Sequence, residues 1–184
     1  MKSKSQILKP ILSYWMALIL ISLLTLQAVA AATTGAVGVK AAKQEKSNWC
    51  WAASGVAVLY RYGKDVSQTN FSLSATGGTS NTAQSVDTVK SGLKKFSISS
   101  SSTSALTFTQ VKTEINNSRP IIVGLTYLVG GGHMVVLNGW DTSSGTNKVQ
   151  YMDPASGKYV VKTYTWLKSN STWTWKQTIY KISK

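Results

Sequence analysis

The predicted architecture rests on one segment, Asn48-Trp-Cys-Trp-Ala-Ala-Ser-Gly-Val-Ala-Val-Leu-Tyr-Arg-Tyr-Gly63. From Cys50 to Tyr62 the residues are apolar on nearly every side of a helix, which predicts a helix buried at the centre of the domain. Gly63 stands where a helix commonly ends, because glycine readily adopts the left-handed conformation found there. Cys50 therefore lies in the first turn of this helix, where unpaired backbone N–H groups favour a thiolate.

The rest of the chain divides into a helical half and a strand-rich half. After the central helix we expect a loop, a second helix, a Ser/Thr-rich linker and a short helix that starts with a capping box at Thr107. These segments cover residues 71–81, 82–96, 97–104 and 107–117. After Pro120, branched and aromatic residues predict strands over residues 121–129, 133–140, 149–153, 158–164 and 173–182, the last of them exposed. The predicted fold class is α+β, with an N-terminal helical half and a C-terminal antiparallel sheet.

The first 32 residues have the layout of a secretory signal peptide. Three lysines precede an apolar run over residues 11–26, and the small residues Ala28-Val-Ala-Ala-Ala32 follow it. An uncleaved membrane anchor is the alternative, because residues 11–32 are long enough to span a bilayer. We expect cleavage, and hence a secreted protein that is extracellular or associated with the cell wall. The expected organisation is a signal peptide over residues 1–32, a flexible segment over 33–43 and one domain over 44–184.

Composition narrows the function classes. The 184 residues include 20 Lys+Arg, 6 Asp+Glu, one Cys and one His, and the formal net charge is +14. Without residues 1–32, which hold three lysines and no acid, the charge is +11. The basic residues are dispersed, which disfavours nucleic acid as a partner and favours an anionic cell-wall or membrane surface. The alternative is that the lysines only keep the surface soluble. One Cys and one His cannot build a disulfide framework within the chain, a Cys-rich zinc site or a three-His metal centre, and we expect no cofactor.

Cys50 and His133 form the one Cys–His pair that the sequence allows. A single Cys in an exported protein is either half of an intermolecular disulfide or a free, reactive thiol. His133 follows three glycines and opens a predicted strand, so a ligand can approach the backbone closely there. A thiolate beside an imidazole is the arrangement that nucleophilic catalysis by cysteine requires.

A third residue should orient the imidazole of His133, and the candidates are Asn138, Asp141 and Asp153. Asn138 lies an odd number of residues along the same strand, so its side chain points to the other face. Asp141 is at the far end of that strand, ~25 Å away if the strand is extended.

Asp153 lies on the returning strand and is the candidate that the sequence favours. If Asp141 pairs with Asn147 around the loop, Asp153 falls opposite Val135. Val135 is the next residue after His133 on the same face, so the carboxylate becomes a diagonal neighbour of the imidazole.

The order and spacing of these residues resemble those of papain-like cysteine peptidases. Gln44 stands six residues before Cys50, and a Gly-His pair that opens a strand comes later. The string Asn48-Trp-Cys-Trp-Ala-Ala53 is similar to the compact bacterial branch of that fold, which includes bacteriocin-leader peptidases and plant-pathogen effector proteases. Gly132-His-Met-Val-Val136 and Tyr151-Met-Asp-Pro154 match the His and Asp segments of this branch.

The resemblance covers residues 44–157 and implies a fold and a set of roles. The fold is two-lobed, with a helical lobe that carries Cys50 and a β lobe that carries His133. Cys50 is the nucleophile, His133 its acid and base, and Asp153 orients the imidazole. Gln44 donates a hydrogen bond to the oxyanion, together with the Cys50 backbone N–H.

The function expected on this basis is a secreted, monomeric cysteine peptidase that hydrolyses polypeptides through an acyl-thioester. The same triad would also serve an amidase, a deamidase or a hydrolase of cell-wall crosslinks. A non-catalytic binding protein on this scaffold is a further alternative. Near the C-terminus, Trp173 and Trp175 share one face of a strand, where they either stack on wall glycan or pack within the β lobe.

Overall fold

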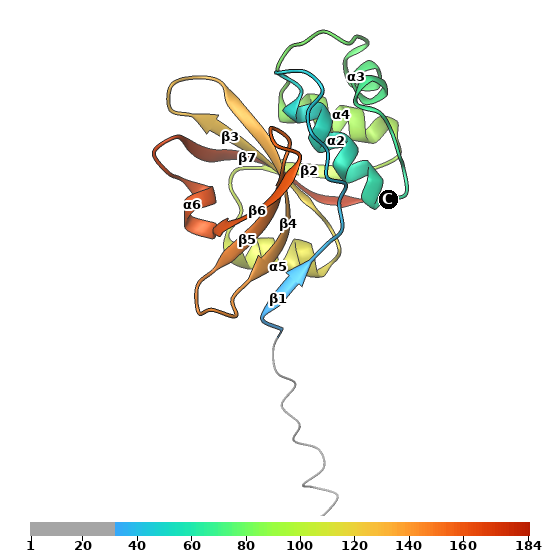
Figure 1. The fold of residues 1–184 in the computed structure, drawn as a ribbon. Coiled ribbons are helices and arrows are strands. Elements are labelled where there is room, and N and C mark those ends of the chain that lie inside the picture. The colour runs from blue at the N-terminus through green and yellow to red at the C-terminus, as the bar shows by residue number, and fades with distance from the viewer. Residues whose placement is uncertain (1–31) are drawn as a thin grey trace, which may run out of the picture. The chain divides into compact units, whose positions relative to one another are not determined.

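Helices precede most of the sheet along the chain, and the two groups lie side by side in Figure 1. The computed structural model describes residues 32–184, so the predicted signal peptide falls outside the described residues except for Ala32. Residues Thr33–Lys184 form one compact unit. Its helices are α2 (Cys50–Arg61), α3 (Gln68–Thr76), α4 (Val86–Lys95), α5 (Phe108–Asn116) and α6 (Tyr164–Lys168). Its strands are β1 (Thr34–Ala36), β2 (Ser99–Thr103), β3 (Ile121–Tyr127), β4 (Gly132–Asp141), β5 (Lys148–Asp153), β6 (Lys158–Thr163) and β7 (Trp173–Ser183).

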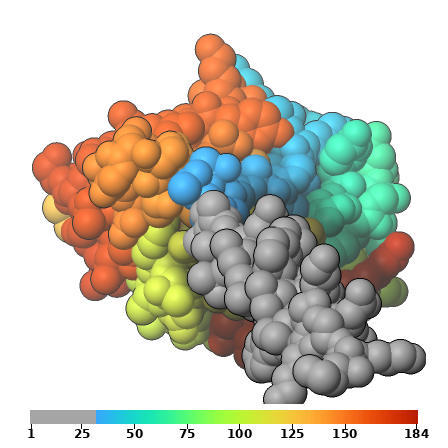
Figure 2. All heavy atoms as spheres, turned by 90° about the horizontal axis from the view of Figure 1, so that it is seen from below, coloured from blue at the N-terminus to red at the C-terminus, as the bar shows by residue number. Residues whose placement is uncertain are grey.

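The strands form one antiparallel sheet in the order β2-β7-β3-β4-β5-β6. β1 pairs with the end of β4, beyond the residues that pair with β3. Figure 2 shows β1 in blue against the orange β4–β5 hairpin and the yellow-green residues of α5. The predicted α+β class, with an N-terminal helical part and a C-terminal antiparallel sheet, is confirmed.

Two clusters of buried apolar residues lie on opposite faces of the sheet. Successive residues of β3 alternate between them, with Ile122 in the cluster around α2 and Val123 in the cluster that α5 and α6 cover. α2 is buried from Trp51 to Leu59, as its sequence predicts. It packs so closely on α3 that a Cβ at Gly55 would meet the ring of Phe71 at 2.3 Å.

Side-chain caps determine where most helices begin. Ser67, Ser85, Thr107 and Thr163 each precede a helix and accept a hydrogen bond from a backbone N–H of its first turn. The capping box predicted at Thr107 is present, with Gln110 as its second member. Among the helices of residues 32–184, α2 is the one that begins without a side-chain cap.

Three segments differ from their sequence-based predictions. Residues 71–76, expected in a loop, belong to α3, which is held by its Ser67 cap and by the buried ring of Phe71. The Ser/Thr-rich segment 97–104 contains β2, which pairs with β7. β7 is not an exposed strand, because it lies between β2 and β3 and buries Trp175 and Ile179.

The N-terminal segment 33–43 also differs from the flexible stretch that its composition suggested. Its backbone pairs with β4 through β1, and the side chains of Val37 and Val39 are buried. Small residues suit this position because Gly35 lies directly against the Trp140 ring, with no room for a Cβ.

Candidate active site

Cys50 is the first residue of α2, and its thiol is free and half-buried. Trp49 and Trp51 on either side of it are fully buried, so the start of the helix is anchored in the core. The first turn contains no acidic residue and has no side-chain cap. Its backbone N–H groups are therefore available to stabilise negative charge at the Cys50 sulfur.

A loop over residues 79–82 holds these two tryptophans in place. The carbonyl oxygen of Ser80 accepts a hydrogen bond from Nε1 of Trp49 at 2.9 Å. The carbonyl oxygen of Thr82 accepts one from Nε1 of Trp51 at 3.0 Å. Both indole N–H groups are satisfied, which fixes the orientation of the rings that flank Cys50.

Asn81, in the same loop, holds the backbone just before Cys50, and the sequence analysis did not identify it. Its Oδ1 accepts a hydrogen bond from the backbone N–H of Asn48 at 3.0 Å, and its Nδ2 donates to Oγ of Ser47 at 2.9 Å. The Asn48 side chain donates in return to the carbonyl of Asn81 at 3.0 Å. Asn81 follows a Gly-rich stretch of the loop and belongs to no motif or periodic pattern, so the sequence gives no indication of its contacts.

His133 and Asp153 form an ion pair, with 2.7 Å between Nε2 and Oδ1. The side chains are 14% and 24% exposed, so little water competes with this bond. The carboxylate accepts two further hydrogen bonds: the backbone N–H of Ala155 donates to Oδ1 at 3.0 Å, and the hydroxyl of Ser156 donates to Oδ2 at 3.3 Å.

The β4–β5 register explains how Asp153 reaches this position. Asp141 pairs one residue later than expected, with Lys148, so the loop prediction was wrong. A bulge further along the hairpin then shifts the pairing back, and Val136 opposes Met152. Asp153 follows Met152 and is therefore level with Val135, as the sequence predicts.

The two rejected candidates make other contacts. Asn138 lies at the bulge and is buried, and its Nδ2 donates to the carbonyl of Val37 at 3.1 Å. Oδ1 of Asp141 accepts a hydrogen bond from the backbone N–H of Ser143 at 2.7 Å. These contacts tie the hairpin to the N-terminal segment and close its turn.

The surroundings of His133 keep the imidazole charged. Burial lowers its pKa, but hydrogen bonds to Asp153 and Cys50 and the charges of both outweigh this effect and raise it to about 9. Burial raises the pKa of Asp153, but the bonds from His133 and from the Ala155 N–H lower it overall. Because Asp153 occupies Nε2, Nδ1 is the ring nitrogen left for Cys50.

Gln44 approaches the site through its backbone, while its side chain is engaged elsewhere. Its N–H donates to the carbonyl of Pro154 at 2.8 Å, directly after Asp153. Its Nε2 donates to the carbonyls of Lys46 at 3.0 Å and Ser47 at 2.6 Å. The amide thus closes the turn that leads to α2.

Tyr127, at the end of β3, is a second residue that the sequence analysis missed. Its N–H donates to the carbonyl of Gly131 at 3.1 Å, two residues before His133. Burial raises the pKa of Tyr127, and the negative charges of Cys50 and Asp153 raise it further. Its hydroxyl therefore lies within electrostatic reach of both groups, but a Tyr in a strand gives no functional signal in the sequence.

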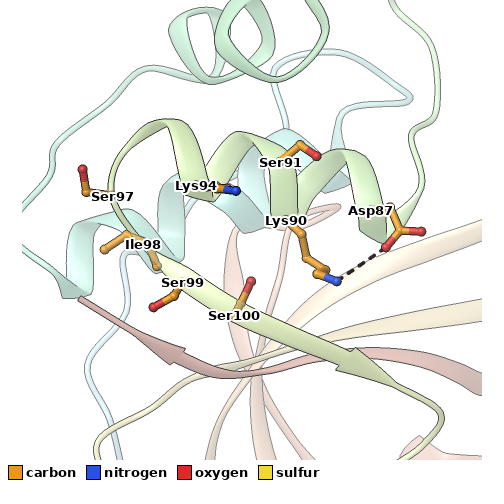
Figure 3. A pocket seen from close by; sticks show the side chains of 8 residues that line it. All are labelled: Asp87, Lys90, Ser91, Lys94, Ser97, Ile98, Ser99 and Ser100. Carbon is orange, nitrogen blue, oxygen red and sulfur yellow. Dashed lines mark ion pairs between the residues drawn. The ribbon is translucent and has the colours of Figure 1, made fainter.

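A cavity of ≈ 640 Å³ lies between α4 and β2, and it contains none of the predicted site residues (Figure 3). Its lining is polar apart from one residue: Asp87, Lys90, Ser91, Lys94, Ser97, Ile98, Ser99 and Ser100. Lys90 points across it and pairs with Asp87 at 3.7 Å. Within residues 32–184, no three His, Cys, Asp or Glu side chains gather as a metal site would require.

Residues 37–182 match the family described as "Peptidase_C39 like family". The chain belongs to this family. The C39-like chain is a cysteine-type peptidase with a papain-like fold, related to bacteriocin-leader peptidases, as the resemblance implied. No curated protein matches the chain.

Two solved structures share the fold of this C39-like peptidase. One is a double glycine motif protease from an AMS/PCAT transporter, in complex with the leader peptide. Its TM-score is 0.59 at 20% identity, and the match covers 81% of this chain and 95% of the other. The second is the peptidase domain of Streptococcus ComA, a bifunctional ABC transporter involved in a quorum-sensing pathway. Its TM-score is 0.57 at 18% identity, and the match covers 76% of this chain and 96% of the other.

Proposed function

We propose that this C39-like peptidase hydrolyses peptide bonds with Cys50 as nucleophile, His133 as acid and base, and Asp153 as the residue that orients the imidazole. The observation that carries the proposal is the 2.7 Å bond between His133 and Asp153. Cys50, at the uncapped start of α2, lies close enough to the same imidazole to raise its pKa. This is the relation of nucleophile, base and orienting group that acyl transfer requires.

The reaction begins with a Cys50 thiolate and a His133 imidazolium. The sulfur attacks the peptide carbonyl, and the negative charge that develops on the carbonyl oxygen is stabilised by the backbone N–H of Cys50. His133 then gives its proton to the leaving amine, and the C–N bond breaks to leave a thioester on Cys50. His133 next takes a proton from water, whose oxygen attacks the thioester and releases the acid and the thiolate.

Gln44 is the second donor proposed for the oxyanion. Its amide closes the turn before α2, so one of its N–H groups must leave the Lys46 or Ser47 carbonyl when the oxyanion forms. Loss of one such donor typically costs about 10²–10³ in kcat. We therefore expect Gln44→Ala to lower kcat by this factor, whereas Gln177→Ala on the exposed surface leaves it unchanged.

The decisive experiment measures hydrolysis of an unstructured polypeptide by Cys50→Ala and His133→Ala proteins. Both substitutions should abolish turnover, and His133→Ala should also slow alkylation of the Cys50 thiol. Asp153→Asn should lower kcat/KM by roughly 10²–10⁴-fold. Asp141→Asn, in the same hairpin, is the matched control and should retain activity. Turnover by the Cys50→Ala protein comparable to that of the wild type would refute the proposal.

The nature of the substrate is tested with the same proteins. A polypeptide substrate predicts new amino termini when unstructured protein is added. Release of ammonia without chain cleavage would indicate a deamidase instead, and activity on purified peptidoglycan alone would indicate a hydrolase of wall crosslinks. Both of these reactions would still require Cys50, because they use the same thioester chemistry.

The peptidase acts outside the cell after residues 1–32 are removed. The basis for this part of the proposal is the lysine-led apolar run and the small residues that follow it. In residues 32–184, the structure contains no helix with the length and apolarity needed to cross a bilayer. Expression of the full chain in a secreting host should yield a product in the medium that begins near residue 33. An intact N-terminus recovered only with membranes would favour the anchor instead.

A further inference from the structure

Gln68 is a buried polar residue that the proposed mechanism does not use. It is the first residue of α3, directly after the Ser67 cap, and it is 4% exposed. Burial of an amide costs free energy unless both its N–H and its carbonyl groups find partners. The side chain of Gln68 finds both partners on one short segment, residues 43–45, which leads to Cys50.

The carboxamide of Gln68 binds the backbone on both sides of Gln44. Its Nε2 donates to the carbonyl of Lys43 at 2.7 Å, and its Oε1 accepts a hydrogen bond from the backbone N–H of Glu45 at 3.0 Å. A parallel neighbouring strand binds a residue in the same way, through the carbonyl before it and the N–H after it. The side chain of Gln68 therefore fixes the backbone at Gln44 as an adjacent strand would.

The backbone N–H of Gln44 binds the turn that follows Asp153. It donates to the carbonyl of Pro154 at 2.8 Å. The turn is closed by the N–H of Gly157, which donates to the carbonyl of Asp153 at 2.7 Å. Gly157 also lies directly against the segment, because a Cβ at this position would meet the Cβ of Lys43 at 2.8 Å. Gln44 is thus held between α3 and the turn that carries the proposed orienting carboxylate.

We infer that Gln68 is a positioning residue that holds Gln44 where its side chain can reach the oxyanion. This inference rests on the proposed function, in which the Gln44 amide leaves the carbonyl of Lys46 or Ser47 when the oxyanion forms. A donor accelerates the reaction when it is already aimed at the place where the charge develops. A side chain that changes partners can meet this condition only if its backbone stays in place, and the two bonds from Gln68 keep it there.

Gln68→Met tests the inference, because methionine has a similar length and makes neither of the two hydrogen bonds. We expect kcat on an unstructured polypeptide to fall about 10–10²-fold with little change in KM, because a misplaced donor fails mainly the transition state. Thr178→Val is the matched control. Thr178 is also buried and also makes two hydrogen bonds, from Nε1 of Trp175 at 2.8 Å and to the carbonyl of Ser104 at 2.7 Å, but it lies on β7. This control should lose stability in denaturant and keep its kcat.

A double-mutant cycle separates positioning from stability. If Gln68 acts through Gln44, Gln68→Met should lower kcat by about twofold or less in a Gln44→Ala background, while its cost in stability persists. All rates are measured at a temperature at which circular dichroism shows each variant folded. Gln68→Asn is a second variant that keeps the amide but is too short to reach both Lys43 and Glu45. Its kcat should lie between those of the wild type and Gln68→Met.

Two results would overturn the role of Gln68 while leaving the peptidase intact. One is a wild-type kcat in the folded Gln68→Met protein, and the other is an equal loss of kcat with and without the Gln44 side chain. A parallel loss of kcat in Thr178→Val would also overturn it, because the effect would then follow stability alone. Failure of the proposed function is distinguishable in the same assay. In that case the wild type would release no new amino termini, or the Cys50→Ala protein would match it, and both proposals would be wrong.

Discussion

The pKa of His133 determines the pH range over which the proposed ion pair with Cys50 exists. Bonds to Asp153 and Cys50 outweigh burial and raise this pKa to about 9. We therefore expect kcat/KM to persist through pH 8 and to fall as the pH rises through about 9, where the imidazolium loses its proton. Asp153→Asn removes one of the charges that hold the proton, so the alkaline limb of its pH–rate profile should move to lower pH.

The same shift predicts how stability depends on pH. The pKa of His133 is higher in the folded state than its ordinary 6.5, so its contribution is complete below pH 6.5 and is lost as the pH rises through about 9. The depressed pKa of Asp153 contributes above its ordinary 3.8 and is lost as the pH falls through the folded value. The Tm of the wild type should thus decline between pH 6.5 and 9, and His133→Ala should reduce that decline. If the alkaline limb of the kcat/KM profile stays in place in Asp153→Asn, the charge of Asp153 does not contribute to the raised pKa of His133.

Site residues can be predicted from the sequence where the chain contains only one residue of the required type. The single Cys and the single His allow one pairing, and strand alternation selects Asp153 as the partner of His133. The predicted pairing of Asp141 with Asn147 was one residue off. Asp153 is still level with Val135, as predicted, because the bulge at Asn138 shifts the register back by one residue. The alternating pattern of apolar residues in a strand does not reveal where a bulge interrupts the pairing. Asn81 was missed because it acts through a hydrogen bond between segments that are distant in the sequence.

Because the loop over residues 79–82 fixes the start of α2, we expect it to affect the proposed catalysis. Asn81→Ala removes the acceptor for the Asn48 N–H and the donor to Ser47, just ahead of Cys50. We expect a fall in kcat with little change in KM, together with a loss of roughly 1 kcal/mol of stability per hydrogen bond. Steady-state kinetics and denaturant unfolding measure the two effects.

Asn116→Ala is the matched control for this loop. Asn116 also accepts a single hydrogen bond through Oδ1, from Nε1 of Trp140 at 3.0 Å, but it belongs to α5 on the other side of the sheet. Its loss removes one hydrogen bond where Asn81→Ala removes two, so it should lower stability by about half as much and leave kcat unchanged. If the two variants lose kcat in parallel, Asn81 contributes stability alone and the positioning role is wrong.

Elements whose signal lies in the local sequence were predicted, and those formed by distant partners were not. α2 and the capping box of α5 carry their own periodicity and caps. α3 buries few side chains, so its apolar pattern is too sparse to indicate a helix. β2 is a run of Ser and Thr that becomes a strand only because β7 supplies the pairing. The alternation of β7 predicts a strand correctly but cannot tell an edge strand from one between two neighbours.

The two faces of the sheet share strands that contribute to both clusters of buried residues. β7 lies between β2 and β3, with Ile179 in the cluster around α2 and Trp175 in the cluster beneath α5 and α6. Thr178 between them is buried and donates to the carbonyl of Ser104, which fixes the strand to the segment before α5. Trp175 therefore packs in the β lobe and does not offer its face to glycan. If β7 left the sheet, both clusters of buried residues would be exposed to water.

This sharing predicts that residues 33–184 unfold as one cooperative unit. Thermal unfolding followed by far-UV circular dichroism and by tryptophan fluorescence should give coincident transitions, because tryptophans are buried on both faces of the sheet. Ile179→Ala empties a fully buried site in the cluster around α2, so it should cost about 2–5 kcal/mol and shift both transitions equally. Val161→Ala, at an exposed position on β6, should shift neither. If Ile179→Ala separates the two transitions, the helical part and the sheet unfold independently, and β7 does not couple them.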